Sequence, residues 1–143
     1  EKKYDLSRFI EAHEKDYQRA LKEVKAGYKR THWMWYIFPQ IQGLGQSPTS
    51  QAYAIRDIDE ARAFLAHPIL RSRLIEICEA LLALPSRDAG HIFGWPDELK
   101  LRSSMTLFAL ADSRLGIFQQ VLDKFFHGKM DQRTIAILQT QQH

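Results

Sequence analysis

"PDELKLRSSMTLFALAD", residues 96–112, is the stretch that decides the fold. Its opening proline and two acidic residues favour a helix start, because acidic side chains suit the positive end of the helix dipole. At about 100° per residue, Leu101, Met105 and Phe108 fall on one side of this helix, and further leucines fall across from them. A helix that is apolar on opposite sides is usually surrounded by other elements. The stretch therefore predicts a central helix.

Helical patterns also occupy most of the chain on either side. Residues 5–27 show the three-and-four apolar spacing of a helix, with Asp5 as its cap and Gly27 as its left-handed end. Further helices are expected at residues 57–67, at 68–84 starting on Pro68, at 87–93 capped by Ser86, at 114–127, and at 131–139 capped by Asp131. Residues 32–38 predict a short helical turn or an extended piece, followed by a loop to about residue 49 and one more short helix at 49–55.

Together these patterns predict an all-α fold. No alternating strand pattern of useful length is present. We expect a single compact multihelical domain over residues 1–143, with about six to eight helices and one ordered loop rich in aromatic residues and glycine. The last residues, 139–143, are expected to fray.

Composition excludes several classes of protein. No segment approaches the ~20 apolar residues of a membrane span, and the N-terminus lacks a signal peptide's apolar core. The single cysteine, Cys78, lies in an apolar helix and is interpreted as a small buried hydrophobe. A cytoplasmic location is the expectation. The net charge of +3 is too small to indicate a polyanionic partner by itself.

"KRTHWMWYIFPQ", residues 29–40, places two tryptophans, a tyrosine and a phenylalanine directly after basic residues. Two interpretations stay open. Trp33, Trp35 and Phe38 are anchors of the core, because aromatic side chains hide ~150–250 Å² each. Alternatively, they form a partly open wall that stacks a flat ring, with Arg30 and His32 steering a negative charge at its rim. The following "GLGQS" loop offers backbone amides to a phosphate, although Gly-x-Gly without a preceding strand is weak evidence.

The central stretch carries polar residues that also allow two interpretations. Its hydroxyl groups bond their own backbone four residues back, and Lys100 and Arg102 lay their stems on the core and reach water. Alternatively, Lys100 and Arg102 with Ser103 and Ser104 form a cradle for an anion, because basic side chains supply charge and hydroxyls supply directed hydrogen bonds. A buried Arg102 requires a partner from the protein or from a ligand.

Other chemistry is sparse. The histidines show no metal-ligand spacing, so no metal site is predicted, and the sequence identifies no cofactor. No nucleophile motif or carboxylate pair stands out. His32 is the first candidate for general acid–base chemistry, because histidine changes charge near neutral pH. The sequence does not indicate whether the protein catalyses a reaction, and it does not indicate the oligomeric state.

Several motifs are distributed along the chain, namely "HWMWYIFPQIQGLGQS", "YAI", "HPIL", "IFGWPDELKLRSSMTLF" and "VLDKFFHGKMDQRT". Together they resemble a bacterial family catalogued as domain of unknown function 1810, and the likeness runs from about Asp5 to Leu138. The resemblance implies a small, mainly helical cytoplasmic protein and supplies no catalytic assignment. Members are sometimes labelled calpastatin-like, but this chain is patterned for a packed core, whereas the inhibitory regions of calpastatin are disordered in isolation.

The leading hypothesis is a site for an anionic, nucleotide-like ligand between residues 29–47 and the central helix. Its expected residues are Arg30, His32, Trp33, Trp35, Gln40, Lys100, Arg102, Ser103 and Ser104. A rival is a protein interaction module that uses exposed aromatic residues. A third hypothesis is binding of single-stranded nucleic acid, which the short basic patch and low net charge disfavour.

Overall fold

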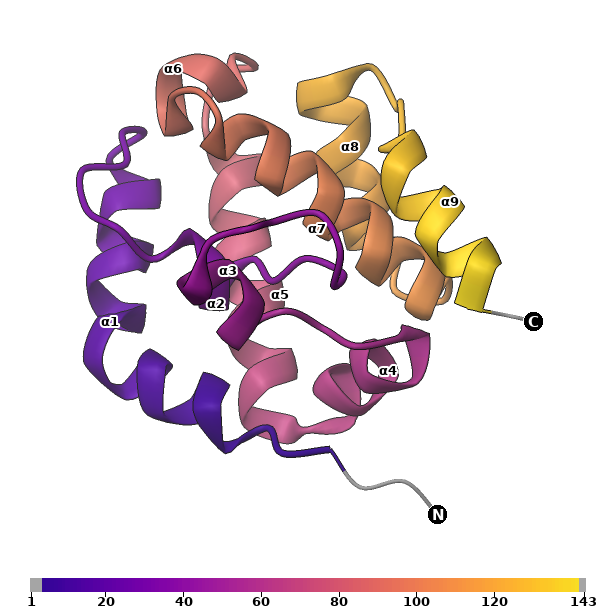
Figure 1. The fold of residues 1–143 in the computed structure, drawn as a ribbon. Coiled ribbons are helices and arrows are strands. Elements are labelled where there is room, and N and C mark those ends of the chain that lie inside the picture. The colour runs from indigo at the N-terminus through magenta and orange to yellow at the C-terminus, as the bar shows by residue number, and fades with distance from the viewer. Residues whose placement is uncertain (1–3, 142–143) are drawn as a thin grey trace.

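Helix α7 (Asp97–Ala111) runs through the middle of the molecule in the computed structural model, which describes residues 4–141 (Figure 1). It packs against α2, α4, α6, α8 and α9. Nine of its fifteen residues are buried, including Ser104 and Thr106. The two-sided apolar pattern of this stretch therefore predicted its central position correctly.

The other helices surround it. They are α1 (Ser7–Lys25), α2 (Met34–Ile37), α3 (Pro48–Ala52), α4 (Ile58–Ala66), α5 (Pro68–Ala83), α6 (Ala89–Phe93), α8 (Ile117–Phe126) and α9 (Gln132–Gln141). Residues 4–141 thus hold nine helices and no strand, one helix more than expected because the segment at residues 32–38, expected as a helical turn or an extended piece, contains the short helix α2. None of these helices is long and apolar enough to span a lipid bilayer. The prediction of an all-α fold is confirmed.

Most helix ends lie where the sequence predicts them. Pro68 is the first residue of α5, Gly27 follows α1 with a φ of 78°, and the Asp131 carboxylate accepts the N–H of Thr134 at 3.0 Å. The cap of α6 is a correction. It is Asp88, whose carboxylate accepts the N–H of His91 at 3.1 Å, whereas Ser86 accepts the N–H of Asp88 and shapes the preceding turn.

The C-terminal helix is longer than expected. Helix α9 continues through Gln141, and the Gln141 side chain donates to the backbone oxygen of Arg56 at 2.8 Å. Residues 139–141 are therefore helical rather than frayed, because the last turn finds a partner on the segment before α4. Residues 142 and 143, also expected to fray, lie outside the described part of the chain.

One continuous core joins the helices. Helix α5 packs on both α1 and α8, and α7 packs on α8 and α4. Cys78 is fully buried, with its sulfur 3.7 Å from that of Met105, and burial raises the pKa of its thiol. This is the environment of a small hydrophobe, as the sequence indicates.

A buried histidine also belongs to this core. His13 is only 3% exposed, and its ring stacks on that of Tyr17. Because Nε2 lies 2.7 Å from the carbonyl oxygen of Tyr36, it carries the proton and donates it. Nδ1 is buried without a hydrogen-bond partner. Burial, together with nearby Arg73, lowers the pKa of His13 to about 4.

This low pKa predicts a loss of stability between neutral pH and pH 5. The unfolded chain takes up a proton near pH ~6.5, whereas folded His13 stays neutral until about pH 4. The free energy of unfolding should therefore fall by about 2 kcal/mol from pH 7 to pH 5. In His13→Gln most of this loss should disappear, whereas His32→Gln, at an exposed position, should keep it. Urea unfolding at both pH values measures the difference. An equal loss in His13→Gln and wild type would contradict the assignment.

Candidate functional site

The segment from Gln40 to Ile55 forms a closed loop beside α7. The N–H of Ile55 donates to the oxygen of Gln40 at 2.9 Å, and the N–H of Gln42 donates to the oxygen of Ile55 at 2.7 Å. These two bonds form the isolated parallel bridge between Ile41 and Ile55. Inside the loop, the Ser47 hydroxyl caps α3 by accepting the N–H of Ser50 at 3.1 Å. The loop is therefore ordered, as the sequence predicts.

Two glycines give the loop its shape. Gly43 has a φ of 108°, a conformation that side chains with a Cβ rarely adopt. At Gly45 the constraint is space, because a Cβ there would lie 2.4 Å from the Cβ of Ser50. Among the described residues, no protein acceptor pairs with the backbone N–H groups of residues 43–46. These amides therefore remain available to another acceptor.

The basic residues of α7 contact α2 and the segment that precedes α9. The Lys100 ammonium lies 5.3 Å from the ring centre of Trp35 and 3.3 Å from the Asp97 carboxylate. Arg102 is half-buried, and its guanidinium donates to the carbonyl oxygens of Lys129 and Met130 at 3.0 and 2.9 Å. The protein thus supplies the partners that a buried Arg102 requires, and these two carbonyl oxygens carry no formal charge.

The hydroxyl groups of α7 are used inside the protein. Ser103 lies 3.1 Å from both the Leu99 carbonyl and the Asp131 carboxylate. Thr106 donates to the Arg102 carbonyl at 2.8 Å and accepts the N–H of Asp131 at 2.9 Å. These are the backbone bonds four residues back that the structural interpretation predicts. The hydroxyls therefore hold the start of α9 in place.

A hollow of about 280 Å³ lies where the loop, α7 and α9 meet. Its lining residues are Gln40, Leu44, Gly45, Ser50, Pro96, Leu99, Lys100, Arg102, Ser103, Asp131 and Arg133. Three cations and one carboxylate belong to this lining. The carboxylate of Asp131 already accepts from Ser103 and from both donors of Thr134. Lys100 also pairs with Asp97, so Arg102 and Arg133 are the lining cations without a carboxylate partner among the described residues. The local charge stays positive, which favours an anion.

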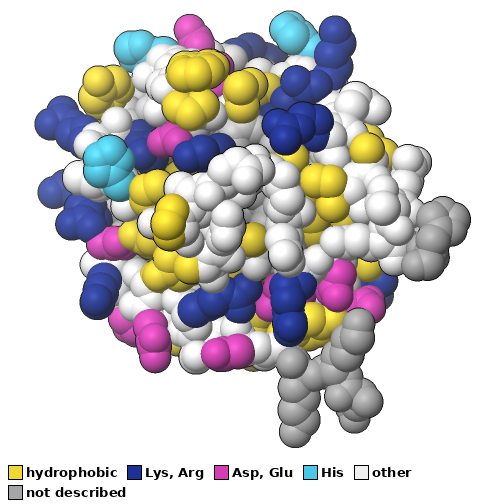
Figure 2. All heavy atoms as spheres, viewed as in Figure 1, with side chains coloured by type: hydrophobic (Ala, Val, Ile, Leu, Met, Phe, Trp, Pro, Cys, Tyr) yellow, Lys and Arg dark blue, Asp and Glu magenta, His cyan; other side chains and the backbone are white. Residues whose placement is uncertain are grey.

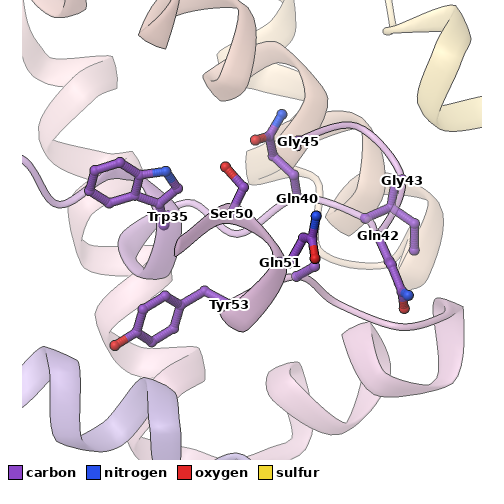
Figure 3. A pocket seen from close by; sticks show the side chains of 10 residues that line it. Trp35, Gln40, Gln42, Gly43, Gly45, Ser50, Gln51 and Tyr53 are labelled. Atoms are coloured by element: carbon purple, nitrogen blue, oxygen red, sulfur yellow. The ribbon is translucent and has the colours of Figure 1, made fainter. Parts of the chain in front are cut away.

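A second, much smaller hollow lies inside the loop itself. It shares Gln40, Gly45 and Ser50 with the first and is also lined by Trp35 and Tyr53. Figure 3 shows the indole of Trp35 at one end and the glutamines of the loop at the other. At about 20 Å³ this hollow suits one water molecule rather than a ligand. We therefore treat the larger hollow as the candidate site.

A family model described as "Protein of unknown function (DUF1810)" matches residues 3–138. The chain belongs to this family. Its structure is similar to the crystal structure of the conserved hypothetical protein Rv1873 from Mycobacterium tuberculosis, with a TM-score of 0.93 and 44% sequence identity over 95% of this chain and 97% of that chain. No curated protein matches it. Neither description states an activity.

In this DUF1810 protein, part of the predicted site lines the hollow. Gln40, Lys100, Arg102 and Ser103 line it, and Trp35 lines the adjoining smaller hollow. The two distant stretches therefore meet, as the hypothesis requires. An ion pair also joins the two stretches, since the Asp97 carboxylate lies 2.8 Å from the ammonium of Lys29.

Four predicted residues lie outside both hollows, and this corrects the expected site. Trp33 is fully buried, and its ring N–H donates to the Glu23 carboxylate at 2.9 Å, so the indole cannot stack a ligand. Ser104 is fully buried, and its hydroxyl has no partner. Arg30 and His32 are exposed, and the Arg30 guanidinium lies over the ring of Tyr28 at 5.9 Å instead.

Other residues of the hollow were missed. Arg133, Leu44 and Leu99 line it but are not among the predicted site residues, although Arg133 belongs to the "VLDKFFHGKMDQRT" motif. Asp131 was predicted only as a cap. The predicted cap at Asp131 could have identified Arg133, because a cap at residue 131 places residue 133 in the first turn of α9. Among the described residues, no group of three or more acidic, histidine or cysteine side chains is placed to hold a metal ion.

The tight approach at Gly45 predicts a specific steric effect. In Gly45→Ala the new methyl group meets the Ser50 side chain, so the variant should lose about 1–3 kcal/mol of stability. Gly116→Ala is the matched control, because nothing lies within 4 Å of a Cβ added there. Chemical denaturation measures both. Adding Ser50→Gly should reduce the cost of Gly45→Ala, and strictly additive effects would contradict the proposed contact.

Proposed function

We propose that this protein binds a small anionic molecule in the hollow between the 40–55 loop, α7 and α9. The observation that carries the proposal is that four predicted residues from two distant stretches share this hollow with Arg133. A nucleotide-like ligand was the finer expectation. The charges of the hollow support the anionic part of such a ligand. Trp33 does not support a stacked ring, because its indole is fully buried.

The hydrogen bonding of the cations supports anion binding. Carbonyl oxygens satisfy the Nε and Nη2 donors of Arg102 but leave its positive charge uncancelled. Arg133 is exposed, and no carboxylate among the described residues forms an ion pair with it. Charge-assisted hydrogen bonds from such groups to phosphate or carboxylate oxygens are about twice as strong as neutral ones. An anion would add what these side chains lack.

The two rival hypotheses have less support. The aromatic cluster at 33–38 offers little surface to a partner protein, because Trp33, Tyr36 and Phe38 are buried, although Trp95 and Tyr28 elsewhere are exposed. In the basic patch that favours single-stranded nucleic acid, Arg30 is exposed. The Lys29 side chain is only 6% exposed and pairs with Asp97. His32 lies outside the lining of the hollow, so we propose no reaction and no general acid or base.

Larger hollows of about 700 and 730 Å³ occur elsewhere on the surface. None of the predicted site residues lines them. Two arginines of the first already have carboxylate partners, since Arg62 pairs with Asp59 and Arg114 with Asp112. Arg71 lies between these hollows and lines both. It therefore offers a matched comparison for Arg133.

Inorganic pyrophosphate is a suitable probe of the anion site. We expect it to bind the wild-type protein and to raise the melting temperature, with an affinity that falls as salt increases. Arg133→Ala should weaken binding by about 10-fold or more, because it removes a charge-assisted contact. Arg71→Ala should leave it unchanged. Isothermal titration calorimetry measures both. Loss of binding in Arg71→Ala but not in Arg133→Ala would move the site to the larger hollows and refute the proposal.

A further inference from the structure

Trp95 is the most exposed of the large apolar side chains in the described part of the chain. It is 79% exposed, whereas Trp33 is fully buried. An indole in the core hides ~150–250 Å², so a tryptophan left in water contributes little of this stabilisation. Packing therefore does not explain this side chain. Exposed tryptophans are typical of surfaces that bind another molecule.

The position of Trp95 connects it with the proposed anion site. Trp95 is not itself among the lining residues, but it directly precedes Pro96, which lines the hollow, and Leu99 and Lys100 of the first turn of α7 line it too. Leu99 is itself 47% exposed. In Figure 2, apolar side chains gather over the end formed by α6 and the beginning of α7, with Lys and Arg side chains beside them. The hollow thus has an apolar rim next to its cations.

The size of the hollow indicates how this rim would be used. Small-molecule pockets usually measure ~300–1,000 Å³, and about 280 Å³ lies just below that range. A ligand larger than a simple anion would extend past Pro96 and Leu99. A flat ring could then lie on the indole, because bases stack on exposed aromatic faces without a need for specific hydrogen bonds.

We propose that Trp95 is the ring-binding residue of the site, and that the ligand is a nucleoside phosphate. Its phosphate would occupy the hollow beside Lys100, Arg102 and Arg133, and its base would stack on the indole of Trp95 at the rim. This inference rests on the proposed anion site, and it assigns to Trp95 the role that the sequence suggested for Trp33 or Trp35. No covalent step is involved.

The test compares two ligands that differ only in the base, AMP and ribose 5-phosphate. Wild-type protein should bind AMP about 5- to 150-fold more tightly, the range expected for one stacked base. Trp95→Ala should reduce the affinity for AMP to that for ribose 5-phosphate and leave the latter unchanged. Trp95→Phe should keep most of the preference, because it retains an aromatic face. Ile69→Ala, which truncates another exposed apolar side chain outside the hollow, should behave as wild type.

The outcomes separate the two proposals. If neither ligand nor pyrophosphate binds, the anion site itself is wrong. If both ligands bind wild type equally and Trp95→Ala changes nothing, the anion site stands and the role of Trp95 is refuted. Equal weakening of both ligands in Trp95→Ala would also refute it, since stacking affects only the base. A concentration-dependent mass that Trp95→Ala abolishes, without a preference for AMP, would assign the indole to a protein contact instead.

Discussion

The buried carboxylate of Glu23 fixes the path of the chain after α1. Its two oxygens accept the backbone N–H groups of Arg30 and Thr31, the hydroxyl of Thr31 and the ring N–H of Trp33, at 2.7–3.0 Å. All of these donors are neutral. A buried charge without a cation is tolerated only when hydrogen bonds replace its hydration. Burial opposes ionisation here, but these bonds prevail and lower the pKa of Glu23 to about 2. The turn at residues 30–33 and the burial of Trp33 follow from this requirement.

A second buried glutamate fixes the other end of the same segment. Glu60 is fully buried and accepts the N–H of Arg56 at 2.7 Å, and the guanidinium of Arg8 contacts it at 3.3 Å. Arg8 also donates to the carbonyl oxygen of Ala54 at 2.9 Å. Residues 30–56 are therefore held at both ends by carboxylates on α1 and α4. Because its ends are fixed, the loop between them can stay irregular and rich in glycine, and it can leave amide groups unpaired beside α7.

These carboxylates also show where prediction from the sequence stops. The central helix, Pro68 and the Asp131 cap follow from local rules, since periodicity and helix ends depend on neighbours within about four residues. The contacts of Glu23 do not, because a glutamate on a helix is normally exposed and nothing nearby in the sequence marks it as buried. Trp33 and Trp95 make the same point. The two residues have the same chemistry, yet one is inside and the other in water, and only the tertiary arrangement decides which.

The candidate site was predictable only in outline, for a related reason. Lys100 and Ser104 are four residues apart and therefore lie on nearly the same side of the helix. The long Lys100 side chain nevertheless reaches the hollow, whereas the short hydroxyl of Ser104 stays buried, so the helical spacing alone could not separate a lining residue from a core residue. Arg133, on a different helix, completes the set only because Ser103 and Thr106 hold Asp131 against α7.

The way Arg102 is held determines the charge of the hollow. A carboxylate partner would have cancelled its charge and left the hollow nearly neutral. Carbonyl partners instead satisfy two donors, restrict the side chain and preserve the positive field. Ser103 and Thr106 hold the start of α9 in place, and in the proposed site Arg102 and Arg133 have no carboxylate partner among the described residues. The polar residues of the central stretch therefore differ in role, with the hydroxyls supporting the fold and Arg102 lining the hollow.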